Sequence, residues 1–406
     1  MGADDVPFET ISLWLPLPYR VLLLPLIGVW LFAFNLHYFQ IVNIDVSPFL
    51  RYTRSSSEAY LHHSVYQIAL VLSGIFCANL FFFWSVTGGR PEDVRRWEII
   101  PMMLFLLMLG VFLWPMGSWH KRGRWRFLRS FRRILTGGID SDLRFADVLL
   151  ADVLTSYAKV IGDAAMVGCM FISGYSSTHP IPNRSCGGAF LVPCVIAIPY
   201  LCRLRQCITE YLRAADKGLP VAERRPHLFN AAKYASAFPV IIMGALQRNY
   251  PTDSEMPLIS RAGLTRGWYA AVLINTLFAF YWDVTRDWEL SLLTSRRSSA
   301  EYPFGLRKNR HFVAVEFYYV AVGLDFLLRF AWSVKLSPHL DFLNEMEGGI
   351  FMLELLEVFR RWVWLFFRVE KEFVAAKDLP YGGLGLDILD RDRVAEEGIM
   401  LDEFKD

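Results

Sequence analysis

Long apolar stretches separated by short polar segments run through the whole chain. Nine of them approach or exceed the roughly 20 residues that an α-helix needs to cross a bilayer. They lie at about 19–42, 64–87, 98–116, 146–173, 188–210, 231–247, 267–285, 312–335 and 348–369. The sixth is short and the fourth contains Asp152, Lys159 and Asp163, so hydropathy alone would rank both low. The pattern predicts an all-α polytopic membrane protein with about nine transmembrane helices.

The remaining segments predict a single membrane domain with short tails. Residues 1–18 contain acidic residues and prolines where a cleavable signal peptide would have a basic region and an apolar core, so we expect the first helix to act as a signal anchor. We divide the chain into a lumenal segment (1–18), three helices with a basic stretch (19–133), six core helices (134–375) and an acidic cytosolic tail (376–406). The composition agrees with a membrane protein, because 54% of the 406 residues are hydrophobic.

Positive charge is distributed unevenly between the predicted loops. Seven Lys and Arg residues lie between Lys121 and Arg133, and the loops at 203–226 and 286–310 are also basic. The positive-inside rule assigns these segments to the cytosol. A glycosylation sequon beginning at Asn183 lies in an opposite loop and requires a lumenal position. We therefore predict a lumenal N-terminus and a cytosolic C-terminus. The basic stretch is either an orientation signal alone or an anionic-lipid site, and the sequence leaves both open.

Cysteine and histidine spacing gives no sign of a metal site. Of six cysteines, Cys186 falls in a predicted lumenal loop and could form a disulfide with Cys169 or Cys194. The eight histidines form no HExxH pattern, and the chain contains no P-loop, dinucleotide-binding turn or nucleophile elbow. We expect no metal, no cofactor and no enzymatic activity.

Charged residues inside the apolar stretches are the informative feature, because a charge at mid-bilayer costs a few kcal/mol. The last stretch reads "ELLEVFRRWVWLFF" and carries two glutamates and two adjacent arginines. In "YWDVTRDWEL", Asp283 and Asp287 are four residues apart and are expected to share a helix face. The charged residues that we single out are Asp152, Asp163, Arg203, Lys233, Asp283, Asp287, Asp325, Arg329, Glu354, Glu357, Arg360 and Arg361.

Two interpretations of these charges compete. In the structural one they form ion pairs at helical spacing, Asp325 with Arg329 and Glu357 with Arg361. In the functional one, three arginines and a lysine in a low-dielectric interior bind a multiply charged oxyanion such as phosphate or sulfate. Nearby aspartates would accept hydrogen bonds from a protonated anion and keep binding weak enough for release.

Six ordered motifs resemble the EXS domain, the membrane part of SPX-EXS phosphate exporters. They are "FADVLLADVLTS", "PYLCRLRQC", "PHLFNAAKY", "YWDVTRDWEL", "LRFAW" and "LEVFRRWVWLFFRVEKE", and with a looser match around the basic stretch they cover roughly 97–375. The resemblance implies an all-α bundle that moves inorganic phosphate. It implies phosphate contacts at Lys233, Tyr234, Arg329, Arg360 and Arg361, with acidic pathway residues at Asp152, Asp283 and Asp287 and the matching arginine at Arg203.

The resemblance also assigns supporting positions and shows departures. Trp332 and Glu357 match positions associated with gating, and we add Asp325 as support. Thr155 stands where exporters of this type usually have Asn, which leaves its supporting role open. Glu289 replaces the commoner Gly of "DWGL" near the predicted cytosolic mouth.

About 18 residues precede the first predicted span, too few for an SPX domain. This resembles the fungal, SPX-less branch of the family, associated with the Golgi and with retention of ER proteins. We therefore expect a Golgi phosphate transporter that returns phosphate from lumen to cytosol and supports glycosylation and protein recycling. The alternatives are a sorting scaffold that holds glycosyltransferases or coat adaptors through cytosolic loops and tail, and transport of another oxyanion. Further expected partners are membrane lipids and, as an open option, a second copy of the chain; nucleic acid is not expected.

Overall fold

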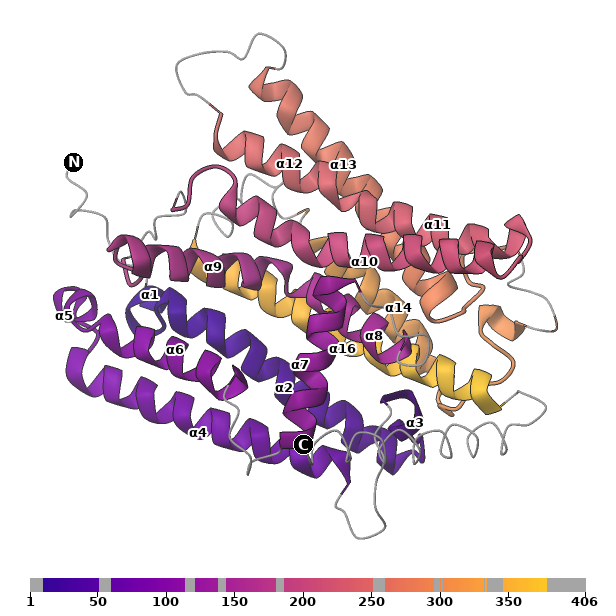
Figure 1. Cartoon of the computed structure of the whole chain (residues 1–406), viewed down its shortest axis with the longest axis horizontal. Coiled ribbons are helices and arrows are strands. Elements are labelled where there is room, and N and C mark those ends of the chain that lie inside the picture. Colours follow the sequence, from indigo (N-terminus) through magenta and orange to yellow (C-terminus); the bar gives the residue numbers. More distant parts are fainter. Residues whose placement is uncertain are drawn as a thin grey trace, which may run out of the picture.

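The computed structural model describes residues 10–50, 60–113, 121–137, 144–179, 186–250, 260–295, 300, 302–331, 333 and 346–377. Every regular element in these ranges is helical (Figure 1). The elements are α1 (Thr10–Trp14), α2 (Leu17–Ile41), α3 (Ser47–Leu50), α4 (Leu61–Thr87), α5 (Pro91–Arg96), α6 (Ile99–Leu113), α7 (Lys121–Thr136), α8 (Arg144–Ser156), α9 (Ala158–Ser173), α10 (Leu191–Asp216), α11 (Val221–Ala235), α12 (Ala237–Arg248), α13 (Arg261–Trp282), η1 (Asp283–Asp287), η2 (Pro303–Gly305), α14 (Val315–Arg329) and α16 (Glu347–Lys377).

The all-α membrane class predicted from hydropathy is confirmed. Four stretches of the described chain are long and apolar enough to cross a membrane: α2, α4, α10 and Val221–Arg248, which joins α11 and α12. Each of the nine predicted apolar ranges contains at least one helix. The number of nine membrane crossings stays a prediction, because the other described helices are shorter or less apolar than these four stretches.

α16 is the central element of the bundle (Figure 1). It packs against α2, α14, α8 and η1. On one side of it α2 packs against α4 and α6, while α10 packs against α9 and α11. α12 and α13 form a helix pair at the opposite edge of the molecule from α4 (Figure 1). This arrangement directs the charged face of α16 toward the interior and not toward lipid.

Three predicted spans are interrupted where the sequence pattern suggested continuous helices. The range 146–173 breaks at Tyr157, 231–247 breaks at Ser236, and 267–285 changes from α-helix to a π-helical turn at Asp283. The Tyr157 hydroxyl lies against Gly28 of α2, where an added Cβ would come within 1.9 Å of its oxygen, so only glycine permits this approach. Apolar periodicity is insensitive to a one-residue interruption, and all three breaks adjoin charged residues.

At Ser236 and at the π-helical turn, backbone groups near the break form hydrogen bonds other than those of a regular α-helix. The Ser236 hydroxyl donates to the carbonyl of Lys233 (2.7 Å), a side-chain bond that competes with helix continuation. In η1 the N–H of Trp288 donates to the carbonyl of Asp283 at 2.9 Å, which is the i+5 bond of a π-helix. Glu289, at the position where the family commonly has glycine, has a φ of 54°, the left-handed region that favours glycine.

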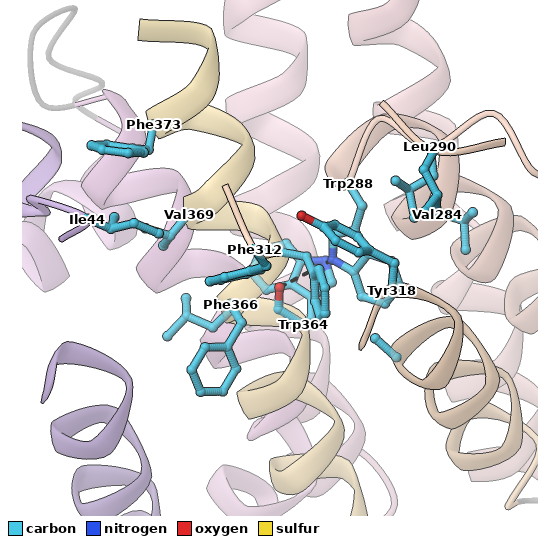
Figure 2. Close-up of a cluster of buried hydrophobic side chains, with 14 of the residues drawn as sticks. Ile44, Val284, Trp288, Leu290, Phe312, Tyr318, Trp364, Phe366, Val369 and Phe373 are labelled. Carbon is cyan, nitrogen blue, oxygen red and sulfur yellow. Dashed lines mark hydrogen bonds between the residues drawn. The ribbon is translucent and has the colours of Figure 1, made fainter. Parts of the chain in front are cut away.

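The largest apolar core cluster surrounds the second half of α16 (Figure 2). Trp288 and Trp364 are both fully buried there, and the Trp288 indole N–H donates to the Trp364 carbonyl at 3.2 Å. Tyr318 and Phe367 pack edge to face beside them, with ring centroids 5.2 Å apart. Close packing of this kind, and not water exclusion alone, holds helices together in lipid. It fixes the rotation of α16 and hence the direction of its arginines.

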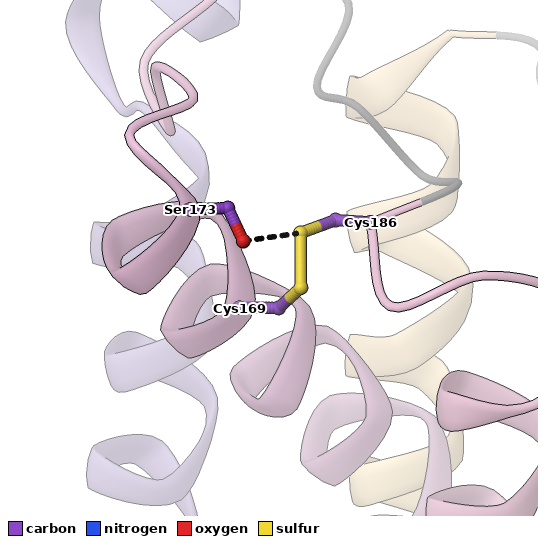
Figure 3. The surroundings of a disulfide bond; sticks show 3 residues. All are labelled: Cys169, Ser173 and Cys186. Atoms are coloured by element: carbon purple, nitrogen blue, oxygen red, sulfur yellow. Dashed lines mark hydrogen bonds between the residues drawn. A yellow bond between two sulfur atoms is a disulfide. The ribbon is translucent and has the colours of Figure 1, made fainter.

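One of the two disulfides that the sequence left open is present. Cys169 of α9 is bonded to Cys186, with Cα atoms 6.1 Å apart (Figure 3). Cys194 is a free, exposed thiol. The bond ties the chain that follows α9 back onto that helix. The sequon at Asn183 lies outside the described residues.

Candidate functional site

The charged residues predicted from the apolar stretches converge on the middle of α16. Five cations and five carboxylates from α8, α10, α11, η1, α14 and α16 form one connected network, which we call the central network. Its members are Asp152, Arg203, Lys233, Asp283, Asp287, Asp325, Arg329, Glu357, Arg360 and Arg361. With every group ionised the network is formally neutral, but its pairs are distributed unevenly.

Arg329 and Arg360 are the heavily paired part of the central network. Asp283 accepts hydrogen bonds from both, the one from Arg360 at 3.4 Å. Asp325 also bridges both arginines, at 3.0 Å in each case. The predicted Asp325–Arg329 ion pair is therefore confirmed, and it is part of a four-residue cluster. Carboxylates bound to two guanidinium groups compensate the cost of burying all four charges.

Glu357 pairs with Arg360, and the predicted Glu357–Arg361 ion pair is wrong. Two guanidinium nitrogens of Arg360 donate to the Glu357 carboxylate at 2.6 and 2.9 Å, a bidentate fork. The three-residue offset serves as well as the four-residue one on a helix, and the rotation of α16 selects it. Glu357 is also the most open carboxylate in these pairs, with 37% of its side chain exposed.

Arg361 has a different environment from its neighbour. Its guanidinium donates to the hydroxyls of Ser156 (2.8 Å) and Thr155 (3.3 Å) and stacks 4.5 Å from the ring centre of Trp364. Within the described part of the chain no carboxylate oxygen lies within 4.0 Å of it. Arg361 is nevertheless buried, with 8% of its surface exposed. A buried cation whose direct contacts are neutral groups keeps hydrogen-bonding and electrostatic capacity for an anion.

Lys233 is the second weakly paired cation. Its nearest carboxylate is Asp287 at 3.9 Å, and its ammonium lies over the rings of Tyr234 (4.4 Å) and Trp282 (5.6 Å). Cation–π contacts hold a charge without neutralising it. Lys233 and Arg361 both interact electrostatically with Asp152 and with Asp283, so the two cations occupy the same part of the interior.

Asp152 anchors the other end of the central network. It accepts from Arg203 at 2.7 Å and from the hydroxyl of Tyr234, and Arg203 also donates to Gln206 at 2.6 Å. Thr155 donates to the Asp152 carbonyl at 2.7 Å while accepting from Arg361. The Thr155 hydroxyl thus makes contacts that an Asn side chain also could, although it is the departure from the family pattern.

Asp283 and Asp287, four residues apart in the π-helical turn η1, have different nearest partners. Asp283 accepts hydrogen bonds from Arg329 and Arg360, whereas Asp287 lies nearest Lys233, which also interacts electrostatically with Asp283. That the two aspartates share one helix face stays a prediction. The sequence contains no simple signal for this turn. It also gave no role to Ser156, which lies at the break before Tyr157 and contacts both Arg360 (3.5 Å) and Arg361.

Some predicted residues lie elsewhere. Glu354 pairs with Lys159 of α9 at 3.3 Å, two helical turns along α16 from Arg361, and Asp163 is buried on α9. Trp332, predicted to gate the pathway, lies outside the described residues, as does the tail from residue 378.

The fold and the central network define a helical membrane protein with a charged interior. A sequence model of the EXS family matches residues 15–374, so the chain belongs to the EXS family. "Protein ERD1 homolog 1" of Schizosaccharomyces pombe is 30% identical over 370 residues, covering 91% of this chain and 93% of that protein. "Protein ERD1 homolog 2" of the same yeast is 28% identical, covering 88% and 96%. The human "Solute carrier family 53 member 1" is 28% identical over 80% of this chain and 47% of that protein.

Proposed function

We propose that this chain transports inorganic phosphate through the central network. The observation that supports this most directly is Arg361, a buried guanidinium whose described partners are two hydroxyls and a tryptophan ring. Lys233, held mainly over aromatic rings, supplies a second charge in the same part of the interior. The relation to a human solute carrier supports membrane transport as the class of activity.

The two kinds of cation suit different parts of a phosphate ion. The planar guanidinium of Arg361 can donate to two phosphate oxygens, whereas the Lys233 ammonium acts as a point charge. At neutral pH one phosphate oxygen carries a proton. The carboxylate of Asp287, beside Lys233, can accept a hydrogen bond from that hydroxyl group. Each contact to phosphate would replace one that the anion makes to water, which is the requirement for passage through a low-dielectric interior.

The ion pairs of Arg329 and Arg360 with carboxylates favour release of bound phosphate. Arg360 is engaged by Asp283, Asp325 and Glu357, so it can approach an anion only by loosening one of those ion pairs. Competition between fixed carboxylates and the ligand keeps affinity moderate, as conduction and transport require. Glu357 is the carboxylate most suited to exchange, because its side chain is the most open of the three.

The proposed direction is from Golgi lumen to cytosol. The yeast relatives with ERD1 names support a place in the secretory pathway. The Cys169–Cys186 disulfide supports a lumenal position for the chain after α9, because disulfides persist in oxidising compartments. That position agrees with the orientation we predict from the basic loops, with the N-terminus lumenal and the C-terminus cytosolic.

The test is phosphate flux into liposomes. We expect purified wild-type protein to pass labelled phosphate and the double variant Arg360→Ala/Arg361→Ala to pass none. Arg368→Ala is the matched control, since Arg368 lies one heptad along α16 and pairs with Glu372 at 2.7 Å. Normal flux in the double variant would overturn the site. Inhibition of the flux by sulfate as effective as by unlabelled phosphate would change the substrate to a general oxyanion.

A sorting scaffold remains the contrasting proposal from sequence. Deletion of residues 381–406 separates the two functions. Transport predicts unchanged phosphate flux in liposomes, while scaffolding predicts lost enzyme recycling in cells that no flux measurement detects. Absence of flux in wild-type liposomes together with lost recycling after the deletion would favour the scaffold.

A further inference from the structure

An open apolar groove lies between α7 and α10, outside the central network. Its volume is about 400 Å³, and its lining is Leu135, Ile198, Leu201, Cys202, Leu204, Arg205 and Ile208. Ile198 and Ile208 are ten residues apart on one helix, so the groove is about 15 Å long. Four of the aliphatic side chains are 42–50% exposed. Its length and apolar lining fit an extended hydrocarbon chain.

α7, which contributes Leu135 to the lining of this groove, is a strongly basic helix. The helix carries seven Lys and Arg residues and no acidic residue. Trp125 and Phe127 are both 43% exposed. A helix that combines a basic face with exposed Trp, Phe and Leu is typical of one that lies in the membrane interface. Figure 1 shows α7 at a steep angle to α2, α10 and α16, as an interfacial helix would be if these long helices cross the bilayer.

The groove is preformed, because α7 is firmly fixed to the bundle. Arg133 makes two 2.8 Å hydrogen bonds to the carboxylate of Asp147 on α8. Ile134 is buried against Ala151 and Cys202. The guanidinium of Arg205 donates to the carbonyls of Leu135 (3.1 Å) and Ile134, which are among the carbonyls that a helix end leaves without helical partners. A segment that served only as an orientation signal would need none of these contacts.

The positive charge of α7 favours an amphiphile with an anionic headgroup as the occupant of the groove. Arg132 is exposed and lies one helical turn before Leu135, which lines the groove, and it forms no ion pair within the described residues. Arg129 is also exposed and lies one turn further along. Each basic residue near a membrane surface attracts anionic lipid electrostatically. A free phosphate ion would leave the apolar lining without an occupant.

We propose that this groove binds an anionic phospholipid of the same leaflet. One acyl chain lies against Leu135, Ile198, Leu201 and Ile208, and the headgroup phosphate contacts Arg132 and Arg129. The α7 stretch is then a lipid-binding element in addition to an orientation signal. Because α8 carries both Asp147 and Asp152, the bound lipid lies at the end of a helix that reaches the central network.

The experiment counts lipids retained by the purified full chain. The protein is incubated in detergent with equimolar phosphatidylserine and phosphatidylcholine of identical acyl chains, and the complexes are resolved by native mass spectrometry. We expect phosphatidylserine to be retained about tenfold over phosphatidylcholine. Arg129→Gln/Arg132→Gln should remove that preference, while Arg224→Gln/Arg225→Gln, which removes the same charge from α11, should keep it.

A second pair of variants tests the groove itself. Leu201→Trp fills the groove and should lower retention of both lipids several-fold, whereas Leu212→Trp, at a similarly exposed position of α10 outside the groove, should not. Equal retention of both lipids by wild-type protein would overturn the proposal, as would loss of preference in the α11 control. Displacement of phosphatidylserine by inorganic phosphate alone would reassign the arginines to a simple anion site. The lipid is counted on the protein, so the result is independent of phosphate transport.

Discussion

Two buried charge clusters lie about ten residues apart on α16, and they differ in how the cost of burying a charge is compensated. Near the end of the helix, Glu370 is fully buried and accepts from the Arg307 guanidinium, the Tyr318 hydroxyl and the N–H groups of His311 (2.7 Å) and Phe312 (3.4 Å). In the central network, Arg361 is also buried, at 8% exposure, but its direct contacts within the described residues are two hydroxyls and a tryptophan ring.

The difference separates structural charges from those available to a ligand. Four donors around one carboxylate leave Glu370 no capacity for another partner, and together they hold the segment at 307–318 against α16. A buried ion that contacts no opposite charge directly is costly, and such ions mark sites where a ligand can supply the contact. The number of built-in partners, and not burial, distinguishes the two clusters.

The largest expected effect is on stability at Glu370. Glu370→Ala leaves the buried Arg307 guanidinium without its carboxylate, and breaking a buried ion pair in this way costs about 3–5 kcal/mol. Thermal unfolding in detergent should show a large drop in midpoint that added phosphate does not restore. Glu372→Ala is the control, because its partly exposed pair with Arg368 should cost under about 1 kcal/mol. Equal midpoints for the two variants would contradict the comparison.

An intermediate effect, on transport and not on stability, is expected at Arg361. Arg361→Gln keeps hydrogen bonds to Ser156 and Thr155 within reach and strands no carboxylate, so its unfolding midpoint should stay close to that of wild type. Loss of a charge-assisted contact of about 2–3 kcal/mol should lower phosphate flux roughly 30- to 150-fold. Flux and midpoint are measured on one preparation. A variant that unfolds like Glu370→Ala but transports normally would reverse the assignment of the two clusters.

The smallest expected effect tests competition within the central network. Glu357→Gln preserves shape but removes the charge that engages Arg360 at 2.6 and 2.9 Å. Arg360 should then bind phosphate more readily and release it more slowly. We expect both the phosphate concentration at half-maximal flux and the maximal flux to fall a few-fold. A rise in that concentration would mean that Glu357 positions Arg360 for the ligand instead of competing with it.

Several features of the molecule follow from sequence because they depend on local chemistry. Apolar runs interrupted by intramembrane charges indicate helical membrane elements, and ordered motifs such as "LEVFRRWVWLFF" indicate the EXS family, which the match over 15–374 confirms. Asp325 and Arg329 pair as their spacing predicts. Cys169 and Cys186 are bonded, one of two pairings that the sequence left open.

Only the tertiary structure decides which charges are left for a ligand. Glu357 forms its ion pair with Arg360 and not with Arg361, and Asp283 and Asp287 have partners from different helices, because packing between helices decides which side chains meet. The residues at two of the breaks also have partners on other helices: Tyr157 lies against Gly28, and Ser236 accepts a hydrogen bond from Asn275. Spacing along one helix fixes which residues are near each other on that helix. The partners of a buried charge come mostly from other helices, and their relative depth and rotation are not written in any single segment.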